Sequence, residues 1–202
     1  MTPAPASRPA RQRLLDAAGR LFYESGIAAT GVDAILGRAG VSPATMYAHF
    51  AGKDGLVAAY LQQRHEEWRQ TWDEVLAERH DPGDRLLSLF DAVARYRERG
   101  GNQRGCGFLA AATELPPGHP GQQWLDADSQ LLTDRLRDLA DQAGARDPGD
   151  LAATLLLLYD GALSRFARAA TTPELPGDDP LVRARRLAGE QVRSALASPH
   201  PG

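Results

Sequence analysis

Apolar side chains recur every three or four residues along most of this 202-residue chain, which is the spacing of one face of an α-helix. An early example has Leu14, Ala18, Leu21 and Phe22 on one face, followed by Gly26, and it predicts a helix from about residue 11 to residue 25. No stretch alternates apolar and polar residues as a half-buried strand does. The pattern therefore predicts an all-α fold of about nine helices.

Residues 31–50 have the pattern of two short helices joined by a glycine turn. The apolar face of the first helix consists of Val32, Ile35, Leu36 and Ala39. Gly40 suits the turn, Ser42 is a favoured N-cap residue, and Pro43 follows at the first helical position, where an N–H is not needed. This is the pattern of a helix-turn-helix, in which the second helix enters the major groove of DNA.

The rest of the chain also reads as helices separated by proline and glycine turns. A long helix is expected from about residue 53 to residue 80, before the break at Asp81-Pro82-Gly83. Asp147-Pro148 and Asp179-Pro180 are matching starts for two last helices, which are expected to run to about residues 170 and 197.

Charge is divided unevenly along the chain. Residues 1–60 carry six Lys and Arg against four Asp and Glu, whereas the remainder carries 17 against 22, for a total of −3. Positive charge therefore accompanies the helix-turn-helix, where phosphates would be bound. Cys106 is the only cysteine, and no apolar run approaches the roughly 18 residues of a membrane span. We expect a cytoplasmic protein.

The first third of the chain resembles the TetR family of transcriptional regulators. The residues that carry the resemblance are Arg13 to Ala18, Leu21-Phe22, Gly26, Thr30, Val32 to Ile35, Ala39 to Ser42, Thr45, Tyr47, His49-Phe50, Lys53 and Leu56. The resemblance implies a DNA-binding domain over residues 8–68 and an effector-binding and dimerisation domain over residues 69–198. It also implies a homodimer that represses transcription from a palindromic double-stranded operator and is released by a small molecule of unknown identity.

Nine residues are expected to face DNA. By the resemblance, phosphate contacts fall on Thr30, Ser42, Thr45, Tyr47, His49 and Lys53, and base edges are faced by Pro43 and Ala44. The recognition helix lacks the long side chains that make paired hydrogen bonds to bases. Sequence readout is therefore left to contacts with thymine methyls, to Arg38, or to the N-terminal arm reaching a minor groove.

A regulator of this kind needs a mostly apolar cavity with a few polar groups. The candidate ligand-binding residues are Trp68, Trp72, Phe90, Cys106, Phe108, Thr113, Trp124 and Tyr159. The same helical spacing is equally compatible with aromatic side chains that only fill the core.

The last two helices are the candidate dimer interface, forming a four-helix bundle with their partners. The residues expected in it are Leu155, Leu158, Ala162, Phe166, Leu187, Ala188, Val192 and Leu196. The alternative is that these apolar faces serve only the core of one protomer.

Other functions are kept as alternatives. One is a helical carrier or enzyme that has lost DNA binding, although the five histidines are scattered and no catalytic pattern is visible. We expect no enzymatic activity, cofactor, metal or membrane contact. Another is redox control through Cys106, because a helix N-terminus and nearby Arg104 would both lower the pKa of a thiol.

Overall fold

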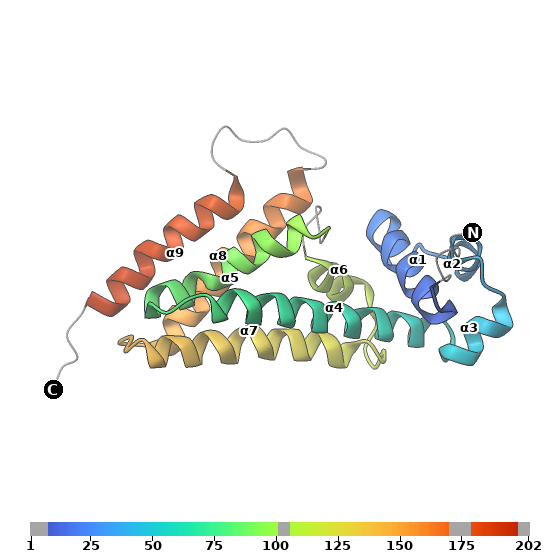
Figure 1. Ribbon diagram of the computed structural model, residues 1–202, viewed down its shortest axis with the longest axis horizontal. Coiled ribbons are helices and arrows are strands. Elements are labelled where there is room, and N and C mark those ends of the chain that lie inside the picture. Colours follow the sequence, from blue (N-terminus) through green and yellow to red (C-terminus); the bar gives the residue numbers. More distant parts are fainter. Residues whose placement is uncertain (1–7, 101–105, 170–178, 198–202) are drawn as a thin grey trace, which may run out of the picture. The chain divides into compact units, whose positions relative to one another are not determined.

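The computed structural model describes residues 8–100, 106–169 and 179–197. Within these ranges it contains nine α-helices and no strand, which confirms the all-α prediction (Figure 1). The helices are α1 (Ala10–Ser25), α2 (Val32–Ala39), α3 (Pro43–His49), α4 (Gly52–Ala77), α5 (Pro82–Glu98), α6 (Gly107–Glu114), α7 (Gln122–Gln142), α8 (Pro148–Ala169) and α9 (Pro180–Ala197). None of these described helices is both long enough and apolar enough to cross a membrane.

The chain divides into two compact units, each made of two separate stretches. The first unit comprises Met1–His65 and Gly107–Asp126, and the second comprises Glu66–Cys106 and Ala127–Gly202. The division within α4 lies three residues before the domain boundary expected at residue 68. Residues 107–126 group with the first unit, although the sequence pattern led us to expect them in the C-terminal domain.

The first unit is organised around the apolar faces of α1, α2 and the start of α4. Leu14, Ile35 and Leu56 have no exposed surface, and the Phe22 and Tyr60 rings meet edge to face at 5.3 Å. Edge-to-face contacts of this kind stabilise a core beyond simple burial. These contacts give α2 and α3 a fixed support.

The second unit is a bundle in which Asp residues begin three helices. Asp81, Asp147 and Asp179 each accept hydrogen bonds from backbone N–H groups in the first turn of α5, α8 and α9. Each cap satisfies donors that a helix start otherwise leaves without a partner. The two last helices therefore begin where the sequence predicts. Residue 170, the expected end of α8, lies outside the described residues.

Buried aromatic residues form the centre of the second unit. Trp68 stacks on Trp72 at 5.9 Å between ring centroids, and Tyr159 lies 6.3 Å from Trp68. The Trp72 indole N–H donates to Ser88 Oγ at 3.0 Å, which satisfies the polar atom of a wholly buried side chain. α4 and α5 are therefore joined by a polar contact inside an apolar core.

Candidate nucleic-acid interface

The recognition helix α3 buries one side and exposes the other. Met46 and Phe50 face the core, as their spacing predicts, whereas Pro43 and Ala44 in the first turn are exposed. Tyr47 keeps 62% of its surface in contact with solvent, which is unusual for a large aromatic residue. His49 is exposed at the end of the same helix. The helix thus offers small groups at its start and an aromatic hydroxyl one turn later.

The start of α3 carries two hydroxyl groups. Ser42 Oγ accepts a hydrogen bond from the Thr45 N–H at 3.2 Å, so it caps the helix as expected. The two hydroxyl oxygens lie 2.9 Å apart, and one hydrogen bond between them uses only one of their two protons. The other hydroxyl proton can still be donated in a hydrogen bond to a phosphate oxygen.

The turn between α2 and α3 is held by α1. Gly40 has φ 59° and ψ 46°, a left-handed conformation that glycine adopts readily. Arg13 Nη1 donates to the carbonyl oxygens of Ala39 and Gly40 at 2.8 and 3.0 Å. A guanidinium at a helix C-terminus is favourable both as a donor and as a positive charge. The sequence pattern does not reveal this role, because the partners are 26 and 27 residues away.

Thr30, a predicted phosphate contact, is bonded within its own loop. The residue is buried, at 3% exposed, and its hydroxyl donates to the Gly26 carbonyl at 2.6 Å. Its side chain closes the loop before α2. The contact between the Thr30 hydroxyl and DNA therefore stays a prediction, since the hydroxyl is bound within the chain in this structure.

The cations predicted to face DNA have partners within the chain. Arg38 Nη1 pairs with Glu24 at 2.9 Å on the exposed surface. Lys53 Nζ donates to the Ala28 carbonyl at 3.3 Å. An ammonium group has three donors, so this bond leaves Lys53 with two for a phosphate.

The N-terminal arm falls mostly outside the described residues, which begin at Arg8. Arg8 pairs with Asp16 at 2.6 Å, and the Arg11 guanidinium lies 5.5 Å from the Phe50 ring centroid. Both cations therefore lie in the first unit, together with the recognition helix.

The eight predicted ligand-binding residues are divided between the two units. Trp68, Trp72, Phe90, Cys106 and Tyr159 belong to the second unit, and Phe108, Thr113 and Trp124 to the first. Burial is the main cause that raises the pKa of the Tyr159 hydroxyl well above its usual value. Thr113 is exposed, and its hydroxyl donates to the Ala110 carbonyl at 2.8 Å. Trp72 and Phe90 have no exposed surface, so they fill the core of the second unit.

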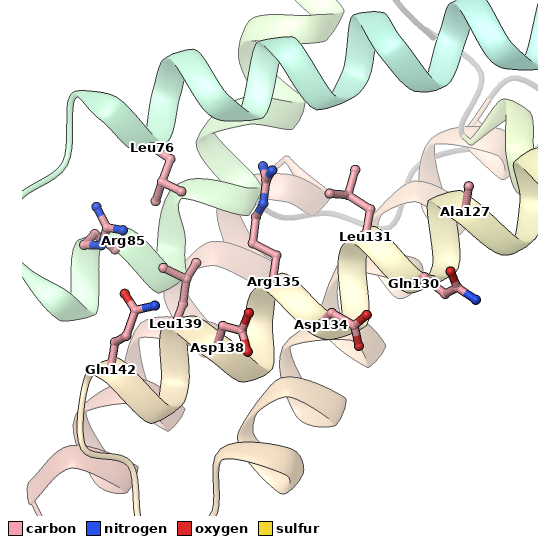
Figure 2. Close-up of a pocket in the computed structure, with 10 residues that line it drawn as sticks. All are labelled: Leu76, Arg85, Ala127, Gln130, Leu131, Asp134, Arg135, Asp138, Leu139 and Gln142. Atoms are coloured by element: carbon pink, nitrogen blue, oxygen red, sulfur yellow. The ribbon is translucent and has the colours of Figure 1, made fainter.

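A groove of about 430 Å³ lies on the second unit, and none of those eight residues lines it (Figure 2). Its walls are Leu76, Arg85, Ala127, Gln130, Leu131, Asp134, Arg135, Asp138, Leu139 and Gln142. This volume is within the range of about 300–1,000 Å³ typical of small-molecule sites. The groove combines three leucines with charged and amide groups, so it suits an amphipathic molecule.

Arg135 is the most constrained polar residue of this groove. Figure 2 shows its side chain rising from α7 towards α4, between Leu76 and Leu131. Its Nη2 atom pairs with Asp73 at 2.7 Å, and its guanidinium carbon lies 4.6 Å from the Trp72 ring centroid. Its Nη1 atom is buried and has no hydrogen-bond partner. A buried donor without a partner costs free energy, and a guanidinium that turned towards the groove could bind an acceptor there.

The predicted dimer residues are mostly covered within the protomer. Leu155, Ala162, Phe166, Ala188 and Val192 are buried in the core of the second unit, and Leu158 and Leu196 pack against it. Leu187 is partly buried. The role of these residues in a dimer stays a prediction. The exposed large hydrophobic residues in the described part of α8 and α9 are Leu157, at 74% exposed, and Val182, at 59%. Sequence spacing alone did not single these two out.

Cys106 lies directly before α6 and is partly buried against the core cluster of the second unit. Arg104, the cation expected to activate it, is outside the described residues.

Comparisons with known proteins agree with this geometry. Residues 14–60 match the family model for bacterial regulatory proteins of the tetR family. The chain is similar to SCO4454, a TetR-family transcriptional regulator from Streptomyces coelicolor, with 30% identity, a TM-score of 0.76, and coverage of 93% of this chain and 94% of that one. It is similar to a putative TetR transcriptional regulator from Streptomyces avermitilis, with 30% identity, a TM-score of 0.75, and coverage of 95% and 100%. It also shares 27% identity over 160 residues with the HTH-type transcriptional regulator YjdC of Escherichia coli, covering 77% of this chain and 82% of that one.

Proposed function

Because the chain belongs to the TetR family of DNA-binding transcriptional regulators, we propose that it is a homodimeric repressor that releases a palindromic operator when a small molecule binds. It acts in the cytoplasm and carries no enzymatic activity. The observation that carries the DNA-binding part is the exposed face of α3, where Pro43, Ala44 and Tyr47 lie on a helix that is capped and supported from α1.

The DNA contacts divide into two kinds. Tyr47, His49 and Lys53, together with the hydroxyl groups of Ser42 and Thr45, bind phosphates and set the register of the dimer. Pro43 and Ala44 contact thymine methyl groups. Arg38 breaks its ion pair with Glu24 and binds the DNA instead. A dimer is required because one small helix-turn-helix contacts only one half-site.

The groove beside α7 is the proposed effector site. An acceptor oxygen of the effector, such as a carboxylate, binds the Arg135 guanidinium once this group turns towards the groove, and an apolar part lies on Leu76, Leu131 and Leu139. Arg135 rests on Trp72, so a ligand that moves the guanidinium changes the packing of a residue in α4. Trp68 and Tyr159 adjoin this contact and take part in the response.

The test begins with capture of genomic DNA fragments by the full chain and footprinting of the enriched sequences. A repressor protects a palindrome, whereas a carrier that has lost DNA binding enriches nothing above non-specific background. Compounds that release the operator are then titrated by calorimetry, with and without DNA. Because coupling is reciprocal, operator DNA should weaken compound binding by the same factor, about 5- to 150-fold for a typical coupling. Equal affinity in both titrations would contradict ligand control.

Arg135→Gln tests the location of the effector site. The variant should keep its operator affinity and lose the response to the compound. Arg137→Gln is the matched control, because it removes an exposed arginine of α7 that does not line the groove. Cys106→Ser separates the redox alternative, since a thiol sensor would lose oxidant-dependent release in this variant and keep release by the compound.

A further inference from the structure

The loop between α1 and α2 is held by a residue from far along the chain. The Ala28 N–H donates to Glu114 Oε2 at 2.7 Å, and Glu114 is the last residue of α6, 86 positions later. The carbonyl of the same Ala28 accepts from Lys53 Nζ at 3.3 Å. Both backbone polar groups of Ala28 are therefore bound, the N–H by a carboxylate and the carbonyl by an ammonium group. We refer to Glu114, Ala28 and Lys53 together as the Ala28 relay.

Gly26 leaves room for the Glu114 carboxylate beside the loop between α1 and α2. Gly26 has φ +87°, and a Cβ atom at this position would lie 3.1 and 3.2 Å from the two carboxylate oxygens of Glu114. A side chain at position 26 would thus be strained and would also crowd Glu114. Thr30 closes the other end of the loop through its bond to the Gly26 carbonyl. The position of the Ala28 peptide is therefore fixed from several directions.

The relay ends at a DNA-facing cation. Lys53 has three donors, and its bond to the Ala28 carbonyl holds the ammonium group in one place while two donors stay available. Glu114 fixes the Ala28 backbone through a charge-assisted hydrogen bond, which is stronger than a neutral one. The orientation of Lys53 thus depends on a carboxylate that does not itself contact Lys53.

We propose that Glu114 is a positioning residue for DNA binding, which acts through the Ala28 backbone to hold Lys53 for a backbone phosphate. The inference rests on the phosphate role of Lys53 proposed above. Charge alone predicts no change when aspartate replaces Glu114, because the charge is kept, whereas the positioning role predicts weaker binding.

Two conservative variants separate the effect of the Glu114 charge from the effect of its side-chain length. Glu114→Gln removes the charge but keeps an oxygen that can accept from Ala28, so operator affinity should stay within about threefold of the parent. Glu114→Asp keeps the charge but withdraws the carboxylate by one methylene, so affinity should fall about tenfold, as for a lost hydrogen bond worth ~1.4 kcal/mol. Asp126→Ala is the control for net charge, because it removes an exposed acid from the same unit. Thermal unfolding of each variant identifies any loss of folded protein.

A double-mutant cycle gives the decisive measurement. Operator affinity and its salt dependence are measured for the parent, Glu114→Asp, Lys53→Ala and the double variant. Lys53→Ala should weaken binding and reduce the salt slope by about one, and adding Glu114→Asp should then have little further effect. Independent, additive effects, or an Asp variant that binds as well as the parent, would overturn the role of Glu114. An unchanged affinity of Lys53→Ala alone would instead refute the phosphate role of Lys53.

Discussion

Tyr47 is a large aromatic residue that the fold leaves in water, one turn into the recognition helix. Its hydroxyl can bind a phosphate without carrying sequence information. We expect Tyr47→Phe to weaken operator and non-specific DNA binding by the same factor of about tenfold or more, because a hydrogen bond to a charged phosphate is worth about 1.5 kcal/mol or more. The salt slope should stay unchanged, because no charge is removed.

Fluorescence anisotropy with operator and scrambled duplexes at several salt concentrations measures both quantities. Tyr23→Phe is a suitable control, because it removes the hydroxyl of a partly buried tyrosine in α1 and leaves the recognition helix intact. A loss confined to the operator would mean that the Tyr47 hydroxyl reads a base.

Residues whose roles depend on near neighbours could be predicted from the sequence. Ser42 caps α3 and Met46 faces inward because both properties follow from helix geometry within a few residues. Arg13 and Glu114 could not be predicted, since their backbone partners lie at least 26 residues away. The burial of Thr30 could not be predicted either, because it depends on the fold around the loop.

Local sequence signals predict the helix boundaries better than they predict the side-chain contacts. The Asp-Pro pairs before α5, α8 and α9 place each helix start, because the acid caps the first turn and proline tolerates the position after it. The end of α4 was expected at about residue 80 and lies at Ala77. The N–H groups of Glu78 and Arg79 bond to carbonyls three residues back, so the helix tightens into a turn before Asp81.

That turn supports a pH-dependent contact between α4 and α5. Arg95 donates two hydrogen bonds to the Glu78 carboxylate at 2.8 Å each, and this bonding is the main cause that lowers the pKa of Glu78. A lowered pKa in the folded state stabilises the protein above the usual glutamate pKa. This contribution is lost as the pH falls through the lowered value.

Glu78→Gln should therefore unfold at a slightly lower temperature than the parent at pH 7, and the difference should disappear in acid. Thermal unfolding followed from pH 7 to pH 2 measures it. Glu190→Gln is the control for net charge, since Glu190 pairs with Arg186 within one exposed helix turn. A difference between Glu78→Gln and the parent that grows as the pH falls would show that ionised Glu78 does not stabilise the folded protein in this way.

At the scale of the whole molecule, dimerisation depends on surface that one protomer leaves exposed. Leu157 on α8 is 74% exposed and is the strongest apolar candidate for the partner. We expect Leu157→Arg to give monomers at micromolar concentration and to lower operator affinity at least tenfold, because the two half-sites are then bound separately. Sedimentation velocity and a binding titration measure the two effects.

Leu109→Arg is the matched control, because Leu109 is an exposed leucine on α6, at 49%. It should leave the oligomeric state unchanged. A dimer that survives Leu157→Arg would place the interface elsewhere.

The proposed effector site is the part of the molecule that the sequence predicts least well. The spacing of aromatic residues identifies helix faces, but α4, α5 and α7 all contribute to the groove, and only their packing brings Leu76, Arg85 and Arg135 to one place. A buried aromatic such as Trp72 has the same sequence signature whether it lines a cavity or fills a core. Arg135 lies among the leucines of α7, and this interruption of an apolar stripe was the one available signal.

The division of the first unit into two stretches limits how such regulators can exchange parts. A chimera joined once, after His65, would receive the DNA-reading helices without the segment Gly107–Asp126 that completes their unit. The transplanted Ala28 would then depend on whatever residue the recipient carries at the position of Glu114. Recombination that preserves DNA affinity should therefore need two crossovers, or a recipient that already has a carboxylate there. If Glu114 positions Lys53 as proposed, DNA affinity in this chain depends on α6 and the start of α7 as well as on the N-terminal third.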